Sequence, residues 1–183
     1  MTSQPSVTGH VFIAASLDGY IARRDGDIDW LSLYGGASED HGYPAFMNSI
    51  DGIVMGRGTF EKVLTFGKWS YDKPVIVMSR SLKDLPTPLI GKATIAAQSP
   101  ETVMENLTAQ GMRRVYVDGG KVIQSFLRAK LIADMIVTHI PVLLGSGIPL
   151  FGEQDGDIGL RHVRTASFPS GLVQSKYEIS NAR

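Results

Sequence analysis

The chain has 183 residues, of which 43% are hydrophobic, so it is long enough to form one domain with a substantial core. Eighteen Lys and Arg residues balance eighteen Asp and Glu residues, and this neutral balance disfavours nucleic acid as a partner. The chain has no cysteine and four widely spaced histidines, which excludes disulfides and cysteine nucleophiles and predicts no metal site.

The N-terminus and the hydropathy pattern predict a soluble, cytoplasmic protein without a membrane partner. Residues 1–8 lack the basic start and the apolar stretch of a signal peptide, and no later apolar run approaches the roughly 18 residues of a membrane span. We expect residues 1–183 to form a single domain, with residues 1–8 as a flexible N-terminus.

Short apolar runs, rich in β-branched residues, predict a series of buried strands along the chain. The first run covers residues 10–15 and ends in the turn sequence Ser-Leu-Asp-Gly. Similar runs, bounded by Pro, Gly or charged residues, occupy residues 53–55, 75–78, 93–97, 115–117 and 135–140.

Between these runs, residues 101–110 and 121–130 place their apolar side chains on one helical face each. Strands that alternate with helices predict an α/β fold with a central sheet. Residues 159–168 and 172–180 are two extended stretches around Pro-Ser-Gly, which predicts a C-terminal β-hairpin. Residues 25–43, rich in Gly, Asp and Ser, predict a long loop beside the active site.

The first candidate binding motif is Gly56-Arg57-Gly58-Thr59, which follows an apolar strand and precedes a predicted helix. Thr59 is suited to cap that helix, and the free N–H groups at the start of the helix would attract an anion. An ordinary strand-to-helix turn that uses glycine for its geometry explains the same pattern.

The second motif is Asp118-Gly119-Gly120, which again links a strand to an amphipathic helix. A side chain at either glycine would block the approach of a phosphate to the backbone N–H groups of the helix start. A glycine pair also occurs in many turns that bind nothing. Because parallel strands end at the same edge of a sheet, both motifs are expected at one edge.

A third motif, Ser79-Arg80-Ser81, follows the strand predicted at residues 75–78. The planar guanidinium of Arg80 and the neighbouring hydroxyls would suit an adenosine 2′-phosphate. A solvated turn with a surface arginine is the alternative interpretation.

These segments resemble, in the same order, those of dihydrofolate reductases and of the reductase domain of riboflavin biosynthesis. The likeness spans nearly the whole chain and is closer to the riboflavin-type domain, in a stand-alone form. It rests on the sequences Ala-Ala-Ser-Leu-Asp-Gly-Tyr-Ile-Ala at residues 14–22, Val-Met-Gly-Arg-Gly-Thr at 54–59, Val-Asp-Gly-Gly at 117–120 and Leu-Leu-Gly-Ser-Gly-Ile-Pro-Leu-Phe at 143–151.

The resemblance implies a dihydrofolate reductase-like three-layer fold, with a mainly parallel central sheet and helices on both faces. It also implies an NADPH site in which the Ala14 backbone lies near the nicotinamide. The residues that would meet the phosphates and the adenosine end are Gly56, Arg57, Thr59, Ser79, Arg80, Gly119, Gly120, Lys121, Val122 and Ile123.

On the substrate side, Asp118 falls where the riboflavin enzymes carry a substrate-binding glutamate, although a structural turn aspartate is an alternative role. Asp40 is the nearest match to the acidic residue that dihydrofolate reductases carry on a helix, but nearby Gly42 and Pro44 disturb that helix. Asp40 and Asp118 are therefore the candidate catalytic residues. Trp30, Tyr43 and Phe46 are candidates to stack on a flat substrate, or else they close the core.

We therefore expect an NADPH-dependent reductase that transfers a hydride to a C=N or C=O carbon of a small heterocyclic or ribosylaminopyrimidine-like substrate. Dihydrofolate reduction is one alternative, and an NADPH-binding sensor without turnover is another. The resemblance and the apolar run over residues 135–144 further suggest a homodimer.

Overall fold

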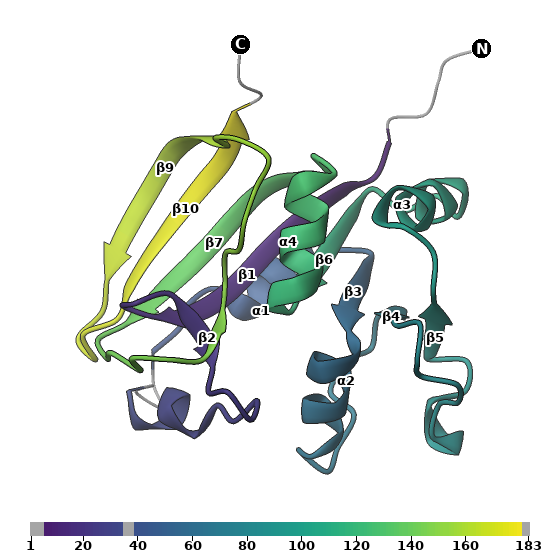
Figure 1. The fold of residues 1–183 in the computed structure, drawn as a ribbon, viewed down its shortest axis with the longest axis horizontal. Coiled ribbons are helices and arrows are strands. Elements are labelled where there is room, and N and C mark those ends of the chain that lie inside the picture. The colour runs from purple at the N-terminus through teal and green to yellow at the C-terminus, as the bar shows by residue number, and fades with distance from the viewer. Residues whose placement is uncertain (1–5, 35–38, 181–183) are drawn as a thin grey trace.

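A central eight-stranded sheet organises the computed structural model, which describes residues 6–34 and 39–180 (Figure 1). The order of the strands is β5-β4-β3-β6-β1-β7-β10-β9. They are β1 Thr8–Ser16, β3 Gly52–Gly56, β4 Val75–Met78, β5 Ala93–Ala96, β6 Arg114–Asp118, β7 Ile132–Ile140, β9 Gly159–Ser167 and β10 Val173–Ser180. Neighbours from β5 to β7 pair in parallel, whereas β10 pairs antiparallel with both β7 and β9.

In the described part of the chain, four α-helices connect these strands, and a second, two-stranded sheet lies beside the first. The helices are α1 Tyr43–Asn48, α2 Arg57–Leu64, α3 Pro100–Ala109 and α4 Gly120–Arg128. Short 3-10 helices cover Asp29–Leu33 and Thr87–Leu89, and β2 Tyr20–Ala22 pairs with β8 Ile148–Pro149.

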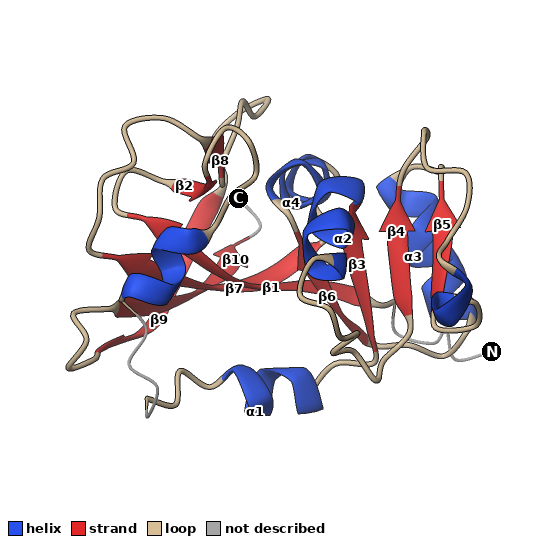
Figure 2. Ribbon diagram, turned by 90° about the horizontal axis from the view of Figure 1, so that it is seen from below, coloured by secondary structure: helices blue, strands red, loops and turns tan. Residues whose placement is uncertain are grey.

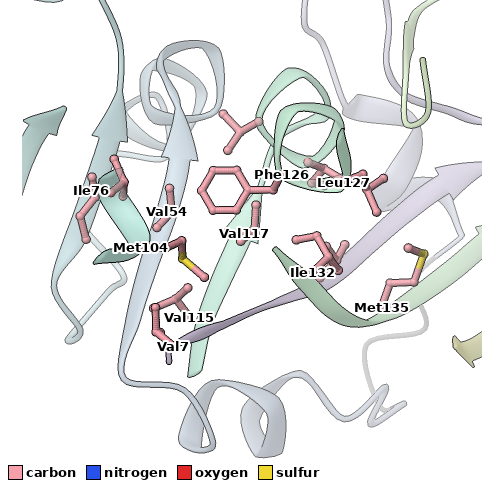
Figure 3. Packing of buried hydrophobic residues seen from close by; sticks show 14 of the residues in the cluster. Val7, Val54, Ile76, Met104, Val115, Val117, Phe126, Leu127, Ile132 and Met135 are labelled. Carbon is pink, nitrogen blue, oxygen red and sulfur yellow. The ribbon is translucent and has the colours of Figure 1, made fainter. Parts of the chain in front are cut away.

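The central sheet separates two hydrophobic layers because successive side chains of a strand point to opposite faces. On one face α3 and α4 bury residues such as Met104 and Phe126 against Val54 and Val117 (Figure 3). On the other face α1 buries Phe46 against the central strands, and Ile50, which follows the helix, packs in the same cluster. Figure 2 shows α1 on one side of the sheet and α4 on the opposite side.

The fold class predicted from the sequence is confirmed: a mainly parallel sheet, helices on both faces and a C-terminal hairpin. The expected flexible N-terminus of residues 1–8 is too long, because Val7 is buried and Thr8 already begins β1. Residues 1–5 of that segment lie outside the described residues.

One further expectation needs correction, and another stays a prediction. Of the run over residues 135–144, residues 135–140 belong to β7, which lies inside the sheet between β1 and β10, whereas Leu143 is 69% exposed. The homodimer suggested by this run stays a prediction. The loop expected over residues 25–43 contains the 3-10 helix Asp29–Leu33, and its residues 35–38 lie outside the described residues.

Within residues 6–34 and 39–180, no helix is long and apolar enough to cross a membrane. The same ranges contain no group of three or more His, Cys, Asp or Glu residues placed to hold a metal ion.

Candidate active site

The two glycine turns meet where β3 and β6, which are neighbouring parallel strands, reach their carboxyl ends. Gly119 has a φ of +90°, a conformation that glycine adopts without strain. A Cβ atom on Gly119 would collide with Oγ1 of Thr59, and one on Gly56 would lie 3.1 Å from Val122. The motifs predicted separately therefore form one continuous surface at this edge of the sheet.

Helix α4 directs its free backbone N–H groups toward this edge. The first helical hydrogen bond of α4 runs from the Ile123 N–H to the Gly119 carbonyl over 2.9 Å. The N–H groups of Gly120, Lys121 and Val122 precede that bond, so they lack an acceptor within the helix. Such a helix start is suited to binding a phosphate group.

Arg57 connects the first motif to the third. It is the first residue of α2, where its Nη1 donates to Ser81 Oγ over 3.0 Å and its Nε donates to Glu61 Oε1 over 2.6 Å. Ser79 Oγ in turn accepts from the backbone N–H of Leu82 over 2.9 Å, which fixes the turn that follows β4. The three motifs are thus neighbours in space as well as at equivalent strand ends.

A groove of about 500 Å³ lies between the ends of β4 and β5 and the first turns of α4. The exposed cations Arg80 and Lys121 both line it, together with the hydroxyl of Ser125. Ser99, which caps α3 through the Thr102 N–H, closes one side. The groove combines two positive charges with polar donors, which is the chemistry that a phosphate monoester requires.

Asp118 lies on the other sheet face, the one that α1 covers. It occupies the last position of β6, two residues after Tyr116, and its Oδ1 accepts the Gly119 N–H over 2.8 Å. Burial raises the pKa of Asp118 from 3.8 to about 6, against the opposing effect of the hydrogen bond from the Gly119 N–H. A carboxyl group with this pKa can hold or release a proton near neutral pH.

Three tyrosines lie near enough to Asp118 for its charge to affect their pKa values. The Tyr116 hydroxyl donates to the Phe12 carbonyl over 2.8 Å. Tyr43, at the start of α1, contacts the ring of Tyr116 with centroids 6.5 Å apart. Tyr71 precedes β4, and its ring lies 5.3 Å from that of Trp69. Burial and the negative charge of Asp118 raise the pKa of all three phenols, that of Tyr43 to about 12.

The turn after β1, the loop before β8 and the start of α4 are held together beside this edge of the sheet. Asp18 accepts the N–H groups of Leu144 and Gly145 over 3.1 and 2.7 Å, which fixes the turn after β1 to the loop before β8. A Cβ atom on Gly120 would lie 2.8 Å from the Pro149 carbonyl oxygen. Gly120 is therefore required for packing of α4 on β8, a structural role that differs from the phosphate approach predicted from the sequence.

Several predicted site residues lie elsewhere. Asp40 is exposed, precedes α1, and accepts the Gly42 N–H over 2.7 Å, so it is not a helical carboxylate that faces Asp118. Trp30 and Phe46 are 1% and 7% exposed, and both pack in the core rather than presenting a face to a ligand. The side chain of Ile123 is fully buried, and its N–H is already bonded within α4.

The position of Thr59 also differs from the expectation. Helix α2 begins at Arg57 with Gly56 as its cap residue, so Thr59 lies inside the first turn and does not cap the helix. Its side chain instead reaches Gly119. Ala14 lies in β1 and packs against the cluster around Trp30, on the same sheet face as Phe12.

The sequence reasoning missed Tyr71 and Tyr116 beside Asp118, and also Gln98 and Ser99 in the groove. Tyr116 could have been identified because it lies two positions before Asp118 on the same strand, and alternate residues share a sheet face. Tyr71 lies in a loop, and no periodicity connects a loop residue with β6.

Comparison with known proteins shows the family of this chain. The RibD C-terminal domain family matches residues 7–174. The uncharacterised Bacillus subtilis protein YwjB is 35% identical over 161 residues, which cover 86% of this chain and 90% of YwjB. A second uncharacterised B. subtilis protein, YyaP, is 28% identical over 90% of this chain and 91% of its own length.

Among solved structures, a Shewanella sp. PV-4 protein assigned to riboflavin biosynthesis superposes with a TM-score of 0.91 at 37% identity, covering 96% of this chain and all of the other. A Thermotoga maritima diaminohydroxyphosphoribosylaminopyrimidine deaminase/5-amino-6-(5-phosphoribosylamino)uracil reductase superposes with a TM-score of 0.71 at 17% identity. The superposition covers 96% of this chain and 57% of the T. maritima chain, and it shows that the two proteins share the fold. The chain belongs to the RibD C-terminal domain family.

Proposed function

We propose that the protein is an NADPH-dependent reductase that acts on a small heterocyclic, ribosylaminopyrimidine-like substrate. The observation that supports this most directly is the convergence of three motifs at one edge of a parallel sheet. The Arg57–Ser81 hydrogen bond joins the first motif, residues 56–59, to the third, residues 79–81. The contact of Thr59 with Gly119 joins the first motif to the second, residues 118–120. Ligands of open α/β sheets bind at such edges.

The geometry of this edge fits the charged parts of NADPH. The N–H groups of Gly120, Lys121 and Val122 would hold the pyrophosphate, and Arg80 and Lys121 in the groove would hold the 2′-phosphate. When bound, NADPH supplies a hydride for a C=N or C=O carbon. The protein would hold the substrate in place, exclude water and provide a proton.

We assign the substrate to the sheet face that carries Asp118 and Tyr43. Asp118 is the half-buried carboxyl group at the boundary between the glycine turn and this face, so it can border both ligands. Helix α1, with the sequence Tyr-Pro-Ala-Phe-Met-Asn, contains no carboxylate, although dihydrofolate reductases bind the pterin through an acidic residue of that helix. This difference favours a pyrimidine-type substrate over dihydrofolate.

The proposal is tested by measuring NADPH binding by fluorescence and NADPH oxidation with a panel of pterins and ribosylaminopyrimidines. We expect binding, and turnover with a member of the pyrimidine group. Turnover with pterins alone would favour dihydrofolate reduction. Tight binding of NADPH without oxidation on any substrate would favour a sensor, and absence of binding would overturn the cofactor assignment.

A further inference from the structure

A cavity of about 580 Å³ lies at the end of the molecule opposite the glycine turns. It is bordered by the last turn of α4, the starts of β7 and β9, the end of β10 and the loop before β9. Figure 1 shows the end of α4 and the end of β10 at the top of the molecule, whereas α2 lies at the bottom. The cavity shares no lining residue with the groove beside Lys121, so it is a separate candidate site.

Four exposed, charged side chains line this cavity, two of each sign. Arg128 ends α4 and Lys130 follows it, whereas Asp155 and Asp157 belong to the loop before β9. None of the four forms an ion pair with another described residue. The Arg128 Nη1 donates to the Glu153 carbonyl oxygen over 3.3 Å, which ties the end of α4 to this loop. The cavity therefore offers positive and negative groups, from two segments, that a ligand can pair.

Aliphatic side chains form another part of the lining. Leu127 and Ile132 are buried, and Ile158 and Ile179 are half-buried. All four belong to or pack against the hydrophobic cluster between the sheet and α3 and α4. This part of the cavity is therefore held by the core, and it suits the apolar part of a ligand.

One polar group that lines the cavity lacks a partner. The Oε1 of Gln154 is buried and has no hydrogen-bond partner among the described residues. Its Nε2 donates to the Gly152 carbonyl oxygen over 3.5 Å, a long hydrogen bond that holds the amide weakly. A buried acceptor without a donor costs free energy. An ammonium group bound beside Asp155 would be a donor near this amide.

Lys130 has a backbone conformation that favours glycine. Among the described residues other than glycine, only Lys130 has a positive φ, of +56°. Its N–H donates to the Leu127 carbonyl over 3.0 Å, and the Leu131 N–H donates to the Phe126 carbonyl over 2.9 Å. Helices often end with this pair of hydrogen bonds, and glycine usually occupies the position of Lys130. Because such backbone strain clusters at functional sites, a lysine here indicates a role for its side chain beyond the fold.

We propose that this cavity binds a small aliphatic zwitterion, of the chemistry that a free α-amino acid and a short peptide share. Arg128 and Lys130 would hold its carboxylate, and Asp155 and Asp157 would hold its ammonium group. A zwitterion is favoured because it pairs charges of both signs, whereas phosphate would pair the two cations and be repelled by the two carboxylates. Binding here involves no electron or proton transfer and does not depend on the proposed reductase function.

Isoleucine methyl groups can report the binding directly. In protein labelled with ¹³C at the Ile Cδ1 methyl groups, L-leucine and the dipeptide L-leucyl-L-leucine are added in separate NMR titrations. We expect the signals of Ile132, Ile158 and Ile179 to shift. Ile53, which is buried on the sheet face that α1 covers, should not shift and serves as the internal reference. The ligand that binds more tightly distinguishes an amino acid from a peptide, and the absence of shifts with both would overturn the site.

Two analogues of leucine test the requirement for both charges. N-acetyl-leucine lacks the ammonium group, and leucinamide lacks the carboxylate. Each should bind roughly ten- to a hundredfold more weakly than leucine, because each loses charged hydrogen bonds. Equal binding of leucine and both analogues would overturn the assignment of a zwitterion.

Substitution of Lys130 separates ligand binding from stability. Lys130→Gly should raise the Tm, because glycine adopts this φ without strain, yet weaken binding of the better zwitterion roughly ten- to a hundredfold. Lys130→Arg keeps the charge and should bind as the wild type does. Asp157→Asn leaves the helix end unchanged and should weaken binding to a similar extent, whereas Lys92→Ala, exposed and outside the cavity, is the control. Wild-type affinity in both Lys130→Gly and Asp157→Asn would overturn the proposal.

Discussion

The carbonyl oxygen of Pro149 lies 2.8 Å from the point that a Cβ atom on Gly120 would occupy. Because real Cβ atoms do not approach a backbone oxygen this closely, α4 can pack against β8 only when its first residue is glycine. The second glycine of the Gly119-Gly120 pair is therefore required by the fold itself. Any effect of a substitution at Gly120 on cofactor binding would be accompanied by a change in stability.

We predict that Gly120→Val lowers the free energy of unfolding by about 1 to 3 kcal/mol, the usual cost of overpacking a core position. Thermal melting by circular dichroism measures the effect. Gly156→Val is the matched control, because a Cβ atom there has no neighbour within 4 Å. A Gly120→Val protein that melts like the wild type would show that β8 moves away from α4 at little cost.

The sequence predicted the strands and helices well because most of them carry a clear hydrophobic pattern. The run predicted at residues 75–78 is β4 to the residue, and the helix predicted at 121–130 is α4 within two residues. The shorter elements were not predicted. Helix α1 is six residues long and follows Gly42, so it has too few turns to establish a helical period.

The candidate site was predictable where it depends on backbone turns and less so where it depends on side chains. Strand ends and glycine turns indicated the edge of the sheet, because their chemistry is local. The aromatic residues Trp30 and Phe46 were ambiguous, since a core and a stacking surface need the same side chains. Only tertiary packing shows that both are buried and that Tyr71 approaches Asp118.

The groove beside α4 predicts a preference for NADPH over NADH. Arg80 and Lys121 both line it, so a 2′-phosphate would gain charged hydrogen bonds of about 1.5 to 3 kcal/mol each. We expect Arg80→Ala and Lys121→Ala each to weaken NADPH binding roughly ten- to a hundredfold, with little effect on NADH, as measured by fluorescence titration. Lys92→Ala, at an exposed position outside this groove, is the control. Equal affinity for both cofactors in the wild type would remove this groove from the site.

The raised pKa of Asp118 predicts an effect of pH on stability. The folded pKa is about 6 and the ordinary value is 3.8, so the folded state binds the proton more tightly than the unfolded state. The contribution of Asp118 to the free energy of unfolding is therefore largest below pH 3.8, and it decreases as the pH rises through about 6. Asn cannot ionise, and Asp118→Asn should therefore have a higher Tm than the wild type at pH 8, with a smaller difference at pH 4. A difference in Tm that does not change with pH would contradict the buried, proton-holding carboxyl group.

The same substitution should reduce catalysis while it stabilises the fold. Asn keeps the shape of Asp118 and an oxygen that can accept the Gly119 N–H, but it loses the negative charge and cannot donate a proton as a carboxylic acid. Loss of a charged hydrogen bond worth about 1.5 to 3 kcal/mol should lower kcat/KM roughly ten- to a hundredfold, with nearly unchanged NADPH affinity. Steady-state kinetics and a cofactor titration measure the two effects separately.

A purely structural role predicts a different result for Asp118. If this side chain only fixed the turn through the Gly119 N–H, the Asn variant would retain that bond and both ligands would bind as in the wild type. If the turn were disturbed, NADPH affinity and kcat/KM would fall together, because Gly119 contacts Thr59 on the cofactor side. A selective loss of kcat/KM, together with the higher Tm at pH 8, is expected only when the carboxyl group faces the substrate. Unchanged kcat/KM in a folded Asp118→Asn protein would exclude Asp118 from the reaction.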